Sequence, residues 1–220
     1  MKNNQELQKD VQDAIRWEPL LNAAEIGVTA IDGVVTLTGT VNSYAKKLEA
    51  EEAAKNVSGV KAVVEEIKIH YGSNYGQKTD SEIANSVLDA LKFNWEVPNE
   101  KIKVKVENAW VTLEGELQWN YQKEAAKKAI KDLAGIMGIT NKITIKTDAT
   151  DTIEKEAIEF ALERNWSIDD DDIDVKVSGN NVTLNGTVES LYQKNEAERI
   201  AWNAPGVWTV DNELVVELDY

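Results

Sequence analysis

The sequence contains no cysteine, a single histidine and only three prolines among its 220 residues. Without cysteine, disulfide bonds, thiolate metal sites and cysteine nucleophiles are excluded. The one histidine, His70, has no second histidine or thiol with which it could share a metal ion. No apolar run approaches the roughly 18 residues that a membrane-spanning helix requires, so we expect no transmembrane segment.

The sequence also lacks the residue patterns that carry catalysis. It has no recognisable pairing of nucleophile and base, and no glycine-rich loop ending in lysine that would cradle phosphates. The acidic run Asp169–Asp172, followed by Asp174, lacks the central glycine and the closing glutamate of a calcium-binding EF-hand loop. We therefore expect a protein that is not an enzyme and that has no metal site and no cofactor.

Charge is distributed unevenly along the chain. There are 24 basic and 39 acidic residues, a net charge of −15. This argues against non-specific nucleic-acid binding, because such binding depends on Lys and Arg contacts to phosphate. Residues 1–74 carry 8 basic and 11 acidic residues (−3), residues 75–147 carry 11 and 10 (+1), and residues 148–220 carry 5 and 18 (−13). An asymmetry of this kind concerns partners and association rather than fold.

A short pattern, V-T-L-x-G, occurs three times. The stretches that contain it are residues 33–41, 109–117 and 180–188. A glycine followed by an aliphatic residue comes 20 residues after each pattern's glycine, at Gly59, Gly135 and Gly206. The copies are 76 and 71 residues apart, which is the signature of an internal repeat. We predict three tandem domains, at residues 1–72, 78–147 and 149–220.

The spacing of apolar residues predicts the same order of elements in each unit. A helical period comes first, as at Leu7, Val11 and Ile15, and two alternating segments then form a hairpin. An alanine-rich helical segment leads to a last strand. We therefore predict an α+β fold of three tandem α-β-β-α-β domains, each a three-stranded mixed sheet with two helices on one face. The pattern leaves open whether the last strand lies beside the first or the second strand.

Three positions of the repeat unit support more specific expectations. Each unit has a glycine at an inward position of its second strand: Gly39, Gly115 and Gly186. Such a glycine indicates a close backbone approach, which we expect the first helix to make. Ala109 stands where the first unit has Gly33, and alanine adopts positive φ poorly, so the second hairpin is expected to turn differently. Trp95 and Trp166 share a repeat position after the first helix, where packing is the expected role.

Residues 32–41, D-G-V-V-T-L-T-G-T-V, together with V-S-G-V at residues 57–60, resemble the BON domain (bacterial OsmY and nodulation). The resemblance is nearly complete in the first unit and covers almost the whole chain in three copies. It implies the α-β-β-α-β fold and a role in osmotic-shock or envelope proteins that contact phospholipid or protein partners. It brings no catalytic residues to this sequence.

Strand alternation places lysines and a tryptophan on the open sheet face of the second unit. The set is Lys101, Lys103, Lys105, Trp110, Lys142 and Lys146. A tryptophan among lysines suits a lipid headgroup layer or an anionic partner. The alternative is that lysine stems cover a structural tryptophan on an ordinary solvated face. The sequence leaves both interpretations open.

The equivalent positions of the third unit are acidic. They are Asp172, Asp174, Glu213 and Glu217. The matched register supports an alternative function, a structural self-assembly module in which the basic face of the second unit pairs with the acidic face of the third. Such pairs attract by roughly a kcal/mol at most and are weakened by salt.

The sequence therefore predicts a non-enzymatic binding protein of tandem BON-like domains. We expect it to contact phospholipid or protein partners under osmotic or envelope stress, and not nucleic acid. The sequence does not indicate an oligomeric state. The first ten residues, MKNNQELQKD, have no apolar stretch, so we expect no secretory signal and a cytoplasmic location. The location is periplasmic if a signal segment has been removed.

Overall fold

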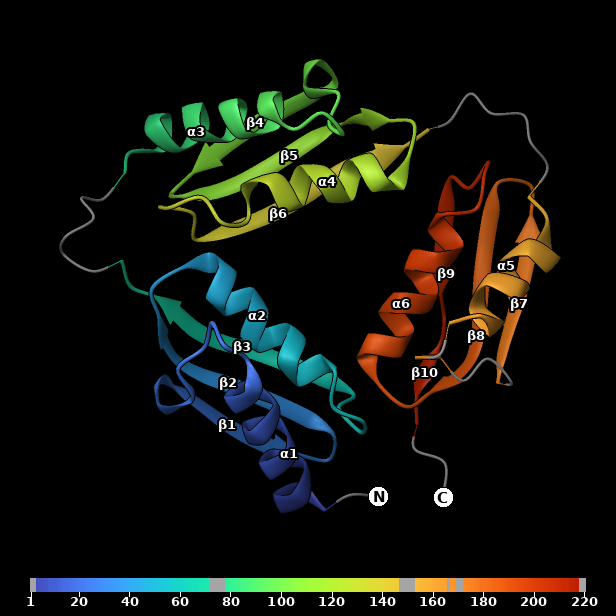
Figure 1. Ribbon diagram of the computed structural model, residues 1–220, viewed down its shortest axis with the longest axis horizontal. Helices are drawn as coiled ribbons and strands as arrows, with labels where there is room; N and C mark the ends of the chain where they lie inside the picture. Colours follow the sequence, from blue (N-terminus) through green and yellow to red (C-terminus); the bar gives the residue numbers. More distant parts are fainter. Residues whose placement is uncertain (1–2, 72–77, 147–152, 166, 169–171, 218–220) are drawn as a thin grey trace. The chain divides into compact units, whose positions relative to one another are not determined.

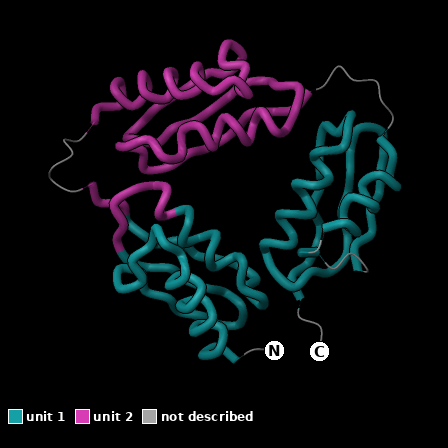
Figure 2. The backbone as a smooth tube through the Cα atoms, in the orientation of Figure 1, with its two compact units in different colours: residues 1–39, 48–68, 149–220 teal, residues 40–47, 69–148 magenta. Residues whose placement is uncertain are grey.

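The computed structural model describes residues 3–71, 78–146, 153–165, 167–168 and 172–217. The backbone divides into two compact units (Figure 2). Residues 1–39, 48–68 and 149–220 form one unit, and residues 40–47 and 69–148 form the other. The residues that the structure describes form three β-sheets. We call each sheet with its two helices a repeat and number the repeats in chain order.

All three repeats run in the predicted order of helix, two strands, helix and last strand (Figure 1). The first repeat consists of α1 (Asn4–Trp17), η1 (Ala23–Glu25), β1 (Ile26–Ile31), β2 (Val34–Val41), α2 (Tyr44–Lys55) and β3 (Ala62–Ile69). The second consists of α3 (Asp80–Phe93), η2 (Asn99–Lys101), β4 (Ile102–Glu107), β5 (Trp110–Leu117), α4 (Asn120–Ile130) and β6 (Gly138–Ile145). The third consists of α5 (Lys155–Glu163), β7 (Ile173–Ser178), β8 (Asn181–Val188), α6 (Leu191–Trp202), β9 (Thr209–Asn212) and β10 (Val215–Val216).

The strand that carries V-T-L-x-G lies in the middle of every sheet. The first strand of each repeat pairs antiparallel with it through the hairpin. The last strand lies on its other side, and in the second and third repeats this pairing is parallel. The last strand of the third repeat is divided into β9 and β10, both paired with β8. The predicted mixed sheets are confirmed, and the strand order that the sequence left open is settled.

Both helices of a repeat cover one face of its sheet and bury their apolar stripe there (Figure 1). In α1 the buried residues are Leu7, Val11 and Ile15. The second helix of each repeat buries alanines: Ala50, Ala53, Ala54, Ala125, Ala126, Ala197 and Ala201. The strands alternate between buried and exposed residues. Each sheet therefore presents a second, open face whose side chains are in contact with water.

The glycine of each V-T-L-x-G strand meets the main chain of a neighbouring segment. A Cβ on Gly39 would clash with the carbonyl oxygen of Glu25, directly before β1. Lys101 and Asp172 hold the same place opposite the glycines of the other two repeats. The predicted close approach is confirmed, but the expectation that the first helix makes it is wrong. Antiparallel pairing puts Gly39 of β2 opposite Ile26 of β1, so the main chain leading into β1 occupies the space that a Cβ of residue 39 would need.

The first and second hairpins share one turn. Both residues of the pair 32–33 have positive φ, and so have Asn108 (51°) and Ala109 (61°). The expectation that the second hairpin turns differently is therefore wrong. The Asp80 carboxylate accepts hydrogen bonds from Asn108 N (2.9 Å) and Ala109 N (2.8 Å), which helps to hold the strained conformation. The third hairpin is the one that differs, since in that turn φ is positive at Gly179 alone (60°).

Candidate functional site

The open face of the second repeat is built from cross-strand rows on β4, β5 and β6. One row joins Lys103 to Lys142 through a glutamate of β5, and the row nearer the hairpin begins with Lys105. Lys101, in η2, and Lys146, directly after β6, lie at the other end of the strands. All five lysines are exposed. The structure thus brings the predicted lysines together on one face and places two of them at its end.

Glutamates on the same face neutralise part of this charge. Three lysines have carboxylate partners: Lys105–Glu107 at 2.8 Å, Lys142–Glu114 at 4.0 Å and Lys146–Glu116 at 3.6 Å. The hydrogen bond that Lys105 donates to the Glu107 carboxylate raises the pKa of Lys105. Exposed pairs of this kind add little to stability. Lys101 and Lys103 have no ion pair within the described part of the chain, so their charges are the ones most available to a partner.

Trp110 is part of the sheet's own packing. Its ring lies over Gly138 in the edge strand β6, where a Cβ would collide with the indole. The indole N–H donates a hydrogen bond to Thr140 Oγ1 at 2.8 Å. An aromatic ring that covers an edge-strand glycine stabilises the pairing at that position. Because 49% of the side chain is still exposed, Trp110 also contributes apolar surface to the open face.

The loop after α3 carries two aromatic side chains that are almost fully exposed. Phe93 is 83% exposed and Trp95 is 90% exposed. The expectation that Trp95 is packed is therefore wrong, and Trp166 lies outside the described residues. Aromatic side chains usually bury large areas of apolar surface, so two of them at one loop indicate a contact surface. One sequence signal pointed here, since Phe93 falls off the buried stripe of α3 that ends at Leu91.

Hydrogen bonds hold this loop in the same turn in all three repeats. In the second repeat, Asn94 N donates to Leu91 O (3.3 Å) and Val97 N donates to Asn94 O (3.1 Å). The Asn94 side chain also accepts from Glu96 N at 2.9 Å. Equivalent main-chain bonds join residues 15, 18 and 21 in the first repeat and 162, 165 and 168 in the third. The fold therefore presents this loop in one way, and the sequence decides which side chains it carries.

Other aromatic and basic residues gather at the same end of the second repeat. The end of α3, the start of α4 and the ends of β5 and β6 all lie there (Figure 1). Trp119 is 37% exposed and Tyr121 is 50% exposed. We call this region the aromatic end; it comprises Lys92, Phe93, Trp95, Lys101, Trp119, Tyr121 and Lys146. Two glutamates of the same loop, Glu96 and Glu100, lie among them in the sequence.

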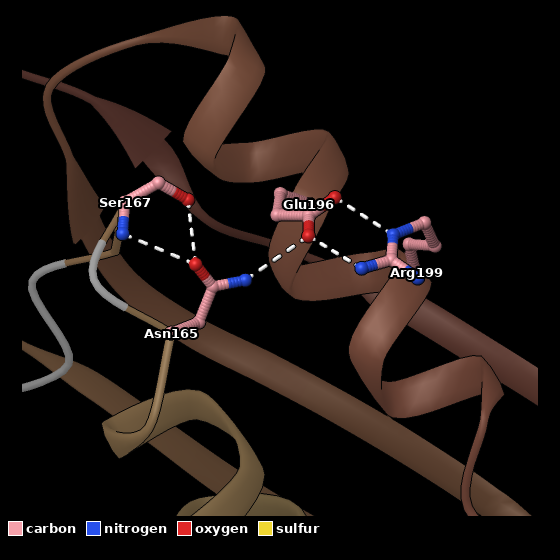
Figure 3. A network of polar contacts seen from close by, with 4 residues as sticks. All are labelled: Asn165, Ser167, Glu196 and Arg199. Carbon is pink, nitrogen blue, oxygen red and sulfur yellow. Dashed lines mark hydrogen bonds and ion pairs between the residues drawn. The ribbon is translucent and has the colours of Figure 1, made fainter.

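In the third repeat, two polar side chains of the equivalent loop take part in a hydrogen-bond network (Figure 3). Asn165 accepts hydrogen bonds from Ser167 N (3.1 Å) and Ser167 Oγ (2.7 Å), and its amide donates to Glu196 Oε1 (3.0 Å). Glu196 also accepts from Arg199 Nε (2.7 Å) and Nη2 (2.5 Å). The hydrogen bond from Arg199 lowers the pKa of Glu196, and Glu196 in turn raises the pKa of Arg199. This network ties the loop to α6.

Near this loop a charged residue replaces an apolar one, and on the open face of the third sheet acidic residues replace lysines. Arg164 takes the place of Phe93, with its guanidinium 4.6 Å from the centroid of the Phe160 ring. On the open face, Asp174 has two partners, Lys176 at 3.5 Å and Lys155 at 3.8 Å. The other acidic residues predicted there are exposed: Asp172, Glu213 and Glu217.

The described residues form neither a metal-ligand cluster nor a membrane-spanning helix. No group of three or more histidine, aspartate or glutamate side chains among them is placed to hold a metal ion. No helix in the described ranges is both long and apolar enough to cross a membrane. Asp169 to Asp171, the start of the acidic run considered for calcium, lie outside these ranges.

The sequence matches the BON domain model three times, over residues 3–71, 79–147 and 150–217. The chain belongs to the BON domain family. Each match contains one sheet and its two helices, so the repeats of the structure are the copies of this domain.

Two relatives share stretches of similar length with this BON chain. It is 30% identical over 143 residues to the osmotically-inducible protein Y of Escherichia coli (strain K12), covering 61% of this chain and 71% of that protein. It is also 30% identical over 131 residues to the 21 kDa hemolysin of Actinobacillus pleuropneumoniae, covering 59% of this chain and 63% of that protein. This second match therefore spans less than two thirds of the hemolysin.

Among solved structures, the C-terminal domain of CdsD aligns over 98% of this chain, with 16% identity and a TM-score of 0.26. CdsD is the structural protein of the type III secretion system of Chlamydia trachomatis. A superposition this loose says nothing about the function of the BON chain.

Proposed function

We propose that this chain is a non-enzymatic binding protein with BON domains at residues 1–72, 78–147 and 149–220. Its second repeat contacts a phospholipid surface through the aromatic end and the adjoining lysines. The name of the Escherichia coli relative, an osmotically-inducible protein, supports a role under osmotic or envelope stress. Phospholipid is available to the protein in the cytoplasm and in the periplasm alike.

The exposure of Phe93 (83%) and Trp95 (90%) carries this proposal. Aromatic rings with a polar edge are favoured where a membrane meets water, and tryptophan is enriched there. Moving such a side chain out of water contributes about 1.5–3 kcal/mol when it is fully buried. The loop is held by hydrogen bonds on both sides of Asn94, so little ordering is needed when it inserts.

Lysines beside the aromatic end supply the second contribution. Each lysine close to an anionic lipid surface adds about 1 kcal/mol. Lys101 and Lys103 are free to make that contact, whereas Lys105 and Lys142 already have carboxylate partners. The attraction is local, because the chain as a whole carries −15 and its third part alone carries −13. We therefore expect binding that requires the second repeat and weakens as salt is added.

Sedimentation of the full chain with vesicles tests this function. The vesicles contain phosphatidylcholine alone or phosphatidylcholine with phosphatidylglycerol, at low and at physiological salt. Phe93→Ala/Trp95→Ala is expected to weaken binding at least about tenfold, the equivalent of 1.4 kcal/mol. A matched control is Phe160→Ala, since Phe160 is 56% exposed but belongs to the acidic third repeat. Wild-type binding by the double variant, or no binding by the wild type, would overturn the proposal.

Charge-reversal variants distinguish the contribution of Lys101 and Lys103 to binding from that of lysines with carboxylate partners. Lys101→Glu/Lys103→Glu should lower binding to the anionic vesicles at low salt and have little effect on neutral ones. Lys105→Glu/Lys142→Glu changes the same formal charge but removes lysines that face Glu107 and Glu114, so its effect should be smaller. Equal losses from both variants would mean that net charge alone drives the interaction.

The opposite charge of equivalent positions favours a second candidate, the self-assembly module. In this function the basic face of the second repeat pairs with the acidic face of the third. Sedimentation velocity across salt concentrations, without lipid, tests it with Lys103→Glu/Lys105→Glu. Salt-sensitive oligomers that the variant cannot form would favour assembly over lipid contact. A monomer at every salt concentration would eliminate assembly between chains.

A further inference from the structure

The loop after α1 carries a second group of exposed apolar side chains. Trp17 is 83% exposed and Leu20 is 59% exposed. We propose that these two residues form a second insertion point, so that the chain contacts a phospholipid interface through its first repeat as well as its second. This inference rests on the proposed function and extends it to a region that the lysine pattern does not mark.

The first-repeat loop has the same turn as the aromatic end. Glu18 N donates to Ile15 O at 3.3 Å, and Leu21 N donates to Glu18 O at 3.0 Å. Trp17 ends α1 as Phe93 ends α3, and in both helices the buried stripe stops two residues earlier. The turn is fixed by the main chain, so the exposure of Trp17 and Leu20 is not the result of a frayed helix end.

The surroundings of this loop make it suited to insertion rather than to charge attraction. From residue 10 to residue 45 the sequence has no lysine, and its one basic residue is Arg16. Arg16 is paired with Asp13 at 3.3 Å. The lysines on either side of this stretch in the sequence are Lys9, in α1, and Lys46, in α2. The contact we propose therefore depends on burying Trp17 and Leu20, with no free cation in the loop itself.

Two insertion points on one chain multiply their effects. Once one loop is bound, the second meets the surface at a high effective concentration, and overall binding can exceed either contact by roughly 100-fold or more. Trp17→Ala/Leu20→Ala is therefore expected to weaken vesicle binding about tenfold or more while leaving the second contact in place. Combining it with Phe93→Ala/Trp95→Ala should abolish binding.

The lack of cysteine allows a direct test on the full chain. Leu20→Cys introduces the one thiol of the protein, which can be labelled with the environment-sensitive dye NBD. Adding vesicles of phosphatidylcholine with phosphatidylglycerol should raise the emission of this label and shift it to shorter wavelength. Ile31→Cys is the matched control, because Ile31 is 65% exposed but ends β1 at the hairpin, away from the loop. Its label should not respond.

A third labelled variant, Phe93→Cys, separates the two proposals. A response at Phe93 with none at Leu20 would overturn the second insertion point and leave the proposed function standing. No response at either position, with no sedimentation of the wild type, would overturn both. A response at Leu20 equal to that at Ile31 would show non-specific contact and would also overturn the second insertion point.

Discussion

The second and third repeats share the same order of helices and strands and have open faces of opposite charge. Both place a V-T-L-x-G strand between an antiparallel and a parallel neighbour. Yet the loop after the first helix exposes Phe93 and Trp95 in one and is tied to α6 through Glu196 in the other. The open faces also differ, with five exposed lysines in the second repeat and a majority of acidic residues in the third.

This difference shows where the fold does and does not constrain the sequence. Buried positions match closely: Val111 and Leu113 in one repeat correspond to Val182 and Leu184 in the other, all of them fully buried. Exposed charges contribute at most about 1 kcal/mol each, so they can change sign without unfolding the domain. The second and third repeats therefore share one pattern of buried core residues and carry different surface residues.

The largest expected effect tests what the two repeats share. Gly115→Ala and Gly186→Ala should each destabilise their repeat by about 3 kcal/mol or more, because the new Cβ would clash with a main-chain carbonyl oxygen. Urea unfolding of the full chain measures this loss. Gly179→Ala is the control, since Gly179 also has positive φ (60°) but has open space around it. Its cost should be about 1 kcal/mol. If either Gly115→Ala or Gly186→Ala left stability unchanged, the two repeats would not share this backbone constraint.

A smaller effect tests the network that is peculiar to the third repeat. Glu196→Gln should destabilise it by about 1 kcal/mol at neutral pH, because the charged hydrogen bonds to Arg199 are lost. In the folded state the pKa of Glu196 lies below its ordinary value of 4.5. The carboxylate therefore stabilises the fold above that pH, and this contribution disappears as the pH falls through the lowered pKa.

Thermal unfolding between neutral and acid pH measures this linkage. The difference between wild type and Glu196→Gln should be constant above about pH 5 and should shrink in more acid solution. Glu163→Gln is the control, because Glu163 is exposed and has no ion pair among the described residues. A difference that stays the same into acid would mean that the network contributes through packing and not through charge.

The smallest expected effect concerns the hairpins. Ala109→Gly should stabilise the second repeat by about 0.5–1 kcal/mol, because glycine adopts φ 61° without strain. Part of this gain is offset by the greater conformational entropy of glycine in the unfolded chain. Asn180→Gly in the third repeat should bring no gain, because φ of Asn180 is not positive. Differential scanning calorimetry can resolve such a shift. Equal shifts in both variants would contradict the difference between these turns.

Much of the architecture could be predicted from the sequence because it depends on local periodicity. The helical stripe of Leu7, Val11 and Ile15, the alternating strands and the repeated glycines are all patterns within a few residues. The open-face lysines followed from alternation as well. The pairing of Lys142 with Glu114 and of Lys146 with Glu116 required the register between strands, and so did the contact of Trp110 with Gly138. That register joins residues about 30 positions apart in the chain.

The sequence by itself determined the number of repeats, the order of their elements, the α+β class and the opposite charge of equivalent open-face positions in the second and third repeats. The tertiary structure decided the remainder. It placed the main chain of Glu25, directly before β1, against Gly39, where the first helix was expected, and it left Trp95 exposed, where packing was expected. The physical reason is that periodicity reports which side of an element is apolar. Whether a given side chain or Cβ finds empty space, solvent or another backbone depends on segments that approach from elsewhere in the chain.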